Sequence, residues 1–249
     1  KVVPPDENFL PDMEVFRSSI NSKTRGVLIN SPNNPSGIIY GDETLSEMCR
    51  IIKEKEVEFG TEIYLVSDEP YRKIIFDNLE YTPIFKYHDR SIVATSHSKD
   101  LALPGERIGY IAVNPSCPDI EELVDGLVFC NRTLGFVNAP ALIQHLIAHL
   151  QDTTIDVRIY EKKRDYLYKE LTNMGYSLIK PQGAFYMFPK SPIEDDVQFS
   201  EELKENRVLV VPGSGFGLPG YFRISYCMED ATIQGSLEGL EKTILKYRQ

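Results

Sequence analysis

The chain has 249 residues, of which 42% are hydrophobic and 26% are charged, a composition typical of a globular protein with one large or two smaller cores. Its formal net charge of −10 argues against a nucleic acid or an anionic membrane surface as partner, because both need clustered Lys and Arg. The four cysteines form no CxxC pair, which predicts neither disulfides nor a metal site and favours a cytoplasmic location. No apolar run is long enough to predict a membrane segment.

Apolar runs and turn signals alternate along the first half of the chain, which favours an α/β fold. The predicted strands are residues 26–30, 62–67, 91–95 and 110–113. The predicted helices are residues 12–16, 43–56 with Asp42 as its cap, 118–128 and a segment that begins at 138.

Residues 31–37 have the sequence SPNNPSG, which follows the first strand. Two prolines, two asparagines and a glycine predict a rigid turn rather than a flexible linker. The simplest interpretation is a connection between a strand and a helix. The functional alternative is that Asn34, fixed by Pro35, presents its side-chain amide as a donor to a ligand oxygen.

The second strand ends in the sequence Ser67-Asp68-Glu69-Pro70-Tyr71. In open α/β sheets, ligands bind at the carboxyl ends of the strands, which is where Asp68 falls. Asp68 could simply cap the following turn. If a pyridine ring binds there, Asp68 would instead keep the ring nitrogen protonated, and Tyr71 would reach the phenolic oxygen of the ring.

Residues 96–110 (SHSKDLALPGERIGY) connect the third and fourth predicted strands. Lys99 therefore lies just past the end of a buried strand, where it can lose its proton and act as an amine nucleophile. Ser96, Ser98 and Arg107 supply the donors that a phosphate needs. A lysine in such a place is also compatible with a solvated loop, so this motif alone does not decide the function.

Taken in order, residues 31–37, 67–71 and 96–110 resemble the motifs of the PLP-dependent aminotransferases of fold type I, the aspartate aminotransferase-like class I/II family. The resemblance implies a partial three-layer α/β/α large domain that binds pyridoxal 5'-phosphate (PLP), at residues 1–154. It implies a smaller α+β C-terminal domain at residues 155–249, which begins with a long linking helix. That helix is predicted up to residue 174.

The resemblance also implies a role for each motif residue. Lys99 would hold PLP as a Schiff base and then move the proton of the substrate's α-carbon. Asp68 would pair with the pyridine nitrogen, and the other cofactor contacts would come from Asn34, Tyr71, Ser96, Ser98 and Arg107. We further expect a cis peptide bond between Asn34 and Pro35.

The last third of the chain is predicted to alternate strands at 176–179, 184–188, 208–211 and 221–226 with helices at 199–206 and 231–247. The glycine-rich residues 212–217 do not precede a helix, so we expect a turn rather than a phosphate loop. Arg223 lies inside an apolar strand, where burial requires an anion or a structural ion pair. In the resembled family this arginine binds the α-carboxylate of the substrate.

The favoured function is therefore transfer of an amino group between an amino acid and a 2-oxo acid. The resemblance also implies a homodimer. Two alternatives stay open: a PLP-dependent lyase, either a carbon–sulfur lyase or one like 1-aminocyclopropane-1-carboxylate synthase, and a non-catalytic scaffold protein. Members of the family usually carry a substantial segment before the position of Lys1. We therefore expect a fragment that is inactive alone, with apolar faces uncovered. The sequence does not indicate which amino acid is the substrate.

Overall fold

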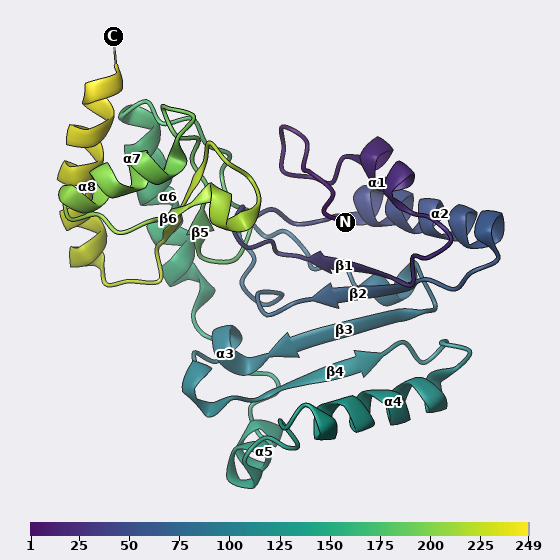
Figure 1. Cartoon of the computed structure of the whole chain (residues 1–249). Helices are drawn as coiled ribbons and strands as arrows, with labels where there is room; N and C mark the ends of the chain where they lie inside the picture. Colours follow the sequence, from purple (N-terminus) through teal and green to yellow (C-terminus); the bar gives the residue numbers. More distant parts are fainter. Residues whose placement is uncertain (249) are drawn as a thin grey trace. The chain divides into compact units, whose positions relative to one another are not determined.

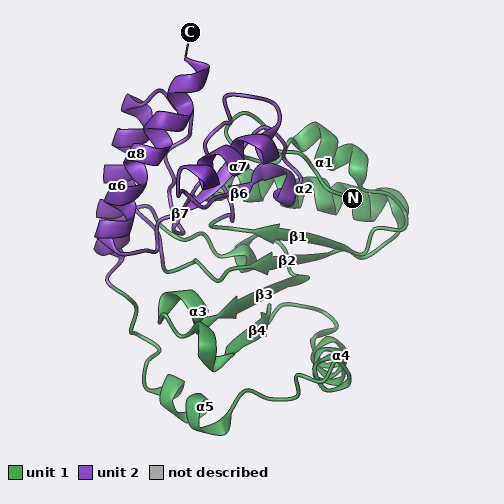
Figure 2. Ribbon diagram, turned by 60° about the vertical axis from the view of Figure 1, so that its left-hand side comes forward, with its two compact units in different colours: residues 1–32, 40–73, 80–155 green, residues 33–39, 74–79, 156–249 purple. Residues whose placement is uncertain are grey.

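The structure, a computed structural model, describes residues 1–248, and the chain divides into two compact units. Unit 1 contains Lys1–Pro32, Tyr40–Lys73 and Glu80–Ile155, and unit 2 contains Asn33–Ile39, Ile74–Leu79 and the chain from Asp156 onward (Figure 2). Two short segments that lie early in the sequence therefore belong to unit 2. Within residues 1–248, no helix has the length and apolar character needed to cross a membrane.

Unit 1 is built on a four-stranded sheet in the order β1-β2-β3-β4 (Figure 1). β1, β2 and β3 are parallel, and β4 pairs antiparallel with β3. These strands confirm the four predicted for this half of the chain. Their bounds are Gly26–Asn30, Tyr64–Asp68, Ser91–Ser96 and Gly109–Val113.

One face of this sheet is covered by the helices α1 (Met13–Ser19) and α2 (Asp42–Phe59). Their apolar stripes follow helical spacing and pack on the inward residues of the strands. Asp42 is the first residue of α2 rather than its cap, because Gly41 occupies the cap position and makes no side-chain hydrogen bond there. The shared core contains Phe16, Ile29, Leu45, Met48, Ile52, Leu65 and Val93.

The rest of unit 1 leaves apolar side chains exposed, as expected from the sequence. On the sheet, Leu28 is 74% exposed and Ile111 is 54% exposed. The helix α4 (Ile120–Thr133) has no buried residue, although one of its faces is apolar. The connection to α5 (Ala141–Ala148) and α5 itself add Leu134, Phe136 and Leu142, each at least 70% exposed.

Unit 2 packs three helices around a small antiparallel sheet in the order β5-β7-β6. The helices are α6 (Val157–Asn173), α7 (Asp196–Glu205) and α8 (Asp230–Ile244), followed by the short 3-10 helix η4 (Leu245–Tyr247). The strands are β5 (Tyr186–Met187), β6 (Val211–Pro212) and β7 (Phe222–Ser225). The long helix, α7, α8 and β7 confirm their predictions within a few residues.

Three predicted strands of unit 2 are wrong or much shorter. Of residues 184–188 only Tyr186 and Met187 form a strand, β5. Residues 176–179 pair with no strand, because the Tyr176 amide donates back to the Leu171 carbonyl and its hydroxyl donates to the Leu240 carbonyl. Of residues 208–211 only Val211 is in a strand, because the Val208 amide donates back to the Leu203 carbonyl at the end of α7. These amides donate to carbonyls at helix ends and are therefore not available for strand pairing.

A buried arginine in α6 was not predicted. Leu167 and Leu171 are the buried apolar residues of this helix, and Arg164 is fully buried as well. Its guanidinium donates to both carboxylate oxygens of Asp77 at 2.7 and 2.8 Å and to the Pro181 carbonyl at 3.0 Å. This ion pair connects α6 to the short segment Ile74–Leu79 of the same unit.

Candidate active site

The carboxyl ends of β2 and β3 meet at one edge of the unit 1 sheet. Asp68 pairs in register with Ala94, and the Glu69 amide donates to the Ala94 carbonyl at 2.8 Å. The Thr95 hydroxyl donates to the Glu69 carbonyl at 3.0 Å. The register therefore brings Asp68 to the edge from which the segment containing Lys99 departs.

Lys99 lies on α3 (His97–Asp100), a single helical turn that directly follows β3. The turn is fixed from both sides: the His97 amide donates to the Ile108 carbonyl at 3.1 Å, and the Ile155 amide donates to the Asp100 carbonyl at 2.8 Å. Beneath it, His97 Nδ1 lies 3.2 Å from a carboxylate oxygen of Asp100, and both residues are buried. Such a short helix is not stable alone, so these contacts determine the position of the Lys99 backbone.

The segment that carries Arg107 returns to the same edge. Gly109 opens β4 opposite Ser96, and a Cβ at Gly109 would lie 2.3 Å from the Thr95 carbonyl oxygen. Only glycine allows this close antiparallel pairing. Arg107, two residues earlier, has φ of 51° and donates from Nη1 to the Pro104 carbonyl at 2.8 Å. Arg107 is therefore placed near the end of β3 but is exposed.

Asp68 has a neighbour that the sequence did not single out. Asn30 ends β1 and pairs in register with Asp68, and its Nδ2 donates to the Asp68 carbonyl at 2.9 Å and to the carboxylate at 3.2 Å. Desolvation raises the pKa of the Asp68 carboxyl, and the hydrogen bond from Asn30 acts in the opposite direction. Asn30 therefore orients the carboxylate and favours its ionised form.

A buried acid lies next to Asp68. Glu69 is 1% exposed, and the Tyr81 hydroxyl donates to its carboxylate. Burial raises the pKa of the Glu69 carboxyl, while the hydrogen bonds from Tyr81 and Ser67 lower it. Two residues further on, Tyr71 is 4% exposed. The edge thus combines an accessible acid, Asp68, with a buried one.

Two further predicted residues, Asn34 and Arg223, lie together in unit 2. Arg223 Nη1 donates to the Asn34 amide oxygen at 2.8 Å, which directs the amide nitrogen of Asn34 the other way. The Asn34–Pro35 bond is cis, as predicted, and Ser31–Pro32 is cis as well. The loop that carries Asn34 is held by Gln182 and Gly183, whose amides both donate to the Gly37 carbonyl at 2.9 Å. No space remains for a side chain at Gly37, because its Cβ would lie 2.6 Å from that of Pro181.

Arg223 is not part of a structural ion pair among the described residues, which was the alternative left open by the sequence. Its guanidinium carbon instead lies 4.4 Å from the ring centre of Tyr186 and 4.8 Å from that of Phe216. Its Nε is buried and has no hydrogen-bond partner within residues 1–248. A guanidinium held in this way is suited to bind an anion.

The sequence of residues 1–240 matches the family model described as aminotransferase class I and II. The chain belongs to the class I and II aminotransferase family. Among solved structures, an aminotransferase from Eubacterium rectale superposes with a TM-score of 0.96 at 44% identity, covering 99% of this chain and 62% of that one. The aspartate aminotransferase of Thermotoga maritima superposes with a TM-score of 0.84 at 29% identity, covering 98% and 64%.

Among curated relatives, a probable aspartate aminotransferase of Methanocaldococcus jannaschii is 35% identical over 251 residues, which is 97% of this chain and 64% of the relative. The chain thus spans less than two thirds of the length of these aminotransferases. Together these similarities confirm the family that residues 31–37, 67–71 and 96–110 resemble, and they confirm the fold type I α/β architecture.

Proposed function

We propose that this protein is an aminotransferase that moves an amino group between an amino acid and a 2-oxo acid, using PLP attached to Lys99. The observation that carries the proposal is the shared edge of β2 and β3, where an amine and a carboxylate follow adjacent parallel strands. In α/β sheets this is where ligands bind. Membership of the aminotransferase family supports the same reaction.

The residues present fit the chemistry of PLP. Its aldehyde needs an amine, which Lys99 supplies, and its pyridine nitrogen needs a carboxylate, which Asp68 supplies. Its phosphate needs hydroxyl and guanidinium donors, and its phenolic oxygen needs hydrogen-bond donors. We assign the phosphate to Ser96, Ser98 and Arg107, and the phenolic oxygen to Tyr71 and Asn34.

Each of these residues has a separate role in the proposed reaction. When bound, PLP would accept the electrons released when the substrate's α-proton is removed. Arg223 binds the substrate carboxylate through its guanidinium, and this contact orients the α-carbon. Lys99 would act on the substrate's α-carbon as general base and then general acid, taking the α-proton and later returning it. Asp68, whose ionised form the hydrogen bond from Asn30 favours, would keep the pyridine nitrogen of the cofactor protonated.

We propose the large-domain role for residues 1–154 and the small-domain role for residues 155–249, as the family resemblance implies. A homodimer and a cytoplasmic location are proposals of the same kind. The exposed apolar residues of α4, α5 and the connecting segment support a covering partner, because isolated proteins rarely expose such patches. Sedimentation of the chain at several concentrations tests the dimer, and a monomer at every concentration would contradict it.

Transfer of a heavy-nitrogen label tests the reaction, since mass spectrometry detects even a few turnovers. The chain is incubated with PLP, 15N-aspartate and pyruvate, aspartate being chosen because several relatives are named aspartate aminotransferases. A panel of other 15N-amino acids follows. We expect at most a trace of label in newly formed alanine, because the chain spans less than two thirds of its relatives' length, and none with the variant Lys99→Ala.

The alternatives give different products. A lyase would release labelled ammonia and form a 2-oxo acid without needing pyruvate. Labelled ammonia in place of labelled alanine would therefore show that the reaction is elimination rather than amino transfer. A scaffold protein would move no label and would not bind PLP covalently, and that pair of results would contradict an enzymatic function.

A further inference from the structure

The guanidinium of Arg223 is more constrained than a hydrogen bond to Asn34 alone would make it. Two aromatic rings contact it, those of Tyr186 and Phe216, at 4.4 and 4.8 Å from the guanidinium carbon. Aromatic rings attract a cation and limit the directions in which it can turn. The buried Nε has no acceptor within residues 1–248, so a donor is held ready beside the rings.

Phe216 reaches Arg223 from a turn with a fixed backbone. The 3-10 helix η3 (Gly213–Phe216) begins at a glycine whose Cβ would lie 2.3 Å from the Leu218 carbonyl oxygen. The Gly213 amide donates to the Tyr221 carbonyl at 2.7 Å, next to Phe222 of β7. This turn is the predicted conformation of the glycine-rich stretch, and its backbone leaves few alternative positions for the ring of Phe216.

The same turn is held by a buried acid. Asp196, at the first position of α7, is 3% exposed, and its Oδ2 accepts a hydrogen bond from the Ser214 amide at 2.6 Å. Nothing else in α7 requires this carboxylate, since the helix is capped by the preceding residue, Asp195, which accepts from the Gln198 amide at 2.8 Å. Asp196 therefore holds the turn in place, whereas Asp195 caps the helix.

We propose that Phe216 and Tyr186 are positioning residues for carboxylate binding by Arg223, and that Asp196 sets the position of Phe216 through the Ser214 amide. The ligand class is a carboxylate of an amino acid or 2-oxo acid, so the inference deepens the proposed function and rests on it. An arginine that is already ordered loses less side-chain entropy when the anion binds. Removing the ring should therefore weaken carboxylate binding without removing the charge.

The test follows the Nε–H signal of Arg223 by NMR in the full 249-residue chain labelled with 15N-arginine. The variant Arg223→Lys assigns the signal. In the wild type we expect slow exchange with solvent, a ring-current shift, and a further shift when pyruvate is added. Phe216→Leu should reduce the ring-current shift to the part that Tyr186 contributes and weaken pyruvate binding about tenfold, the equivalent of about 1.4 kcal/mol. Phe216→Tyr keeps a ring and should bind within about twofold of the wild type.

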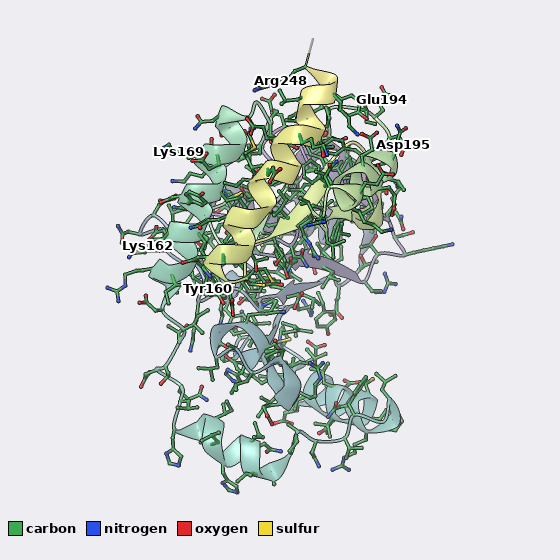
Figure 3. All side chains as sticks on the ribbon, turned by 90° about the vertical axis from the view of Figure 1, so that its left-hand side faces the viewer. Tyr160, Lys162, Lys169, Glu194, Asp195 and Arg248 are labelled. Atoms are coloured by element: carbon green, nitrogen blue, oxygen red, sulfur yellow. The ribbon has the colours of Figure 1, made fainter. Side chains whose placement is uncertain are left out.

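Two adjacent acids provide a matched pair for the turn. Asp196→Ala should reproduce the effects of Phe216→Leu on the Arg223 signal, and Asp196→Asn, which keeps an acceptor oxygen, should restore it. Asp195→Ala removes a helix cap and should leave the signal unchanged. Asp195, the cap that precedes α7, is labelled in Figure 3. Thermal unfolding of each variant separates loss of the turn from loss of the fold.

Each outcome decides the proposal. Unchanged pyruvate binding in folded Phe216→Leu would overturn the positioning role of the ring, and equal effects of Asp195→Ala and Asp196→Ala would overturn the role of Asp196. Neither result would affect the proposed function. That function fails separately if Lys99 takes up no PLP and pyruvate does not change the wild-type Arg223 signal. In that case the ring-current shift would still report the contact with Phe216.

Discussion

Asn30 and Asp68 are register partners at the ends of two adjacent parallel strands, and the Asn30 amide donates to the Asp68 carboxylate at 3.2 Å. The contact joins the last residue of β1 to the last residue of β2. It therefore depends on the strand register rather than on any sequence motif. It places a neutral donor beside the acid that we assign to the pyridine nitrogen.

Replacing Asn30 by Ala should raise the pKa of Asp68. The hydrogen bond lowers that pKa, so its loss leaves desolvation unopposed. Titration of the Asp68 carboxyl by 13C NMR measures the change. Asn131→Ala is the control, because within residues 1–248 the Asn131 side-chain amide donates only to the Val137 carbonyl, on an exposed segment. A lower or unchanged Asp68 pKa in the Asn30 variant would contradict the assignment.

Replacing Glu69 by Gln should stabilise the protein at neutral pH. Burial raises the folded-state pKa of Glu69 above its ordinary value of 4.5, so the folded state holds this proton more tightly than the unfolded chain. The resulting stability is fully present below pH 4.5 and is lost as the pH rises through the folded-state pKa. Gln stays neutral and still accepts from Tyr81. Urea unfolding at pH 4 and pH 8 measures the effect.

The difference between Glu69→Gln and the wild type should therefore grow from pH 4 to pH 8. Glu80→Gln is the matched control, since Glu80 is an exposed acid in the same unit. Its effect should be small at both pH values. A Glu69→Gln difference that does not change with pH would show that the buried acid has no raised pKa.

Replacing Arg164 by Met should destabilise unit 2 by about 2 kcal/mol, because the Pro181 carbonyl and the Asp77 carboxylate lose their donors. Met fills much of the volume, so the cost reports the polar contacts. The control is Arg158→Met in the same helix, where the side chain is 81% exposed and, among the residues that the structure describes, pairs only with Asp156. Chemical denaturation should detect a loss only for Arg164, and equal losses would contradict the structural role of the buried pair.

The sequence predicts the local parts of this fold well because an apolar run of strand length and an apolar helical spacing both involve residues that are close together in the sequence. The edge with Asp68 and Lys99 follows from the same signal, since both come directly after buried strands. Arg164 was missed because its partner Asp77 is 87 residues away and no local pattern marks a buried cation. Asn30 becomes informative only when the register pairs it with Asp68.

The contacts of Arg223 show the same limit. Its apolar strand indicated an anion or an ion pair, but the rings of Tyr186 and Phe216 come from other segments. The carboxylate of Asp196, which fastens the turn, lies 18 residues from Ser214. Only tertiary structure brings these groups together. Residues 176–179 show the converse, an apolar run whose amide is taken by a helix end.

The central claim is that Lys99 holds PLP, and chemical trapping tests it most directly. The chain is saturated with PLP, reduced with borohydride and digested, and mass spectrometry then locates the modified lysine. The account predicts modification at Lys99, with much less in Asp68→Ala and none at that position in Lys99→Ala. Modification spread over exposed lysines, with Lys99 unlabelled, would contradict it.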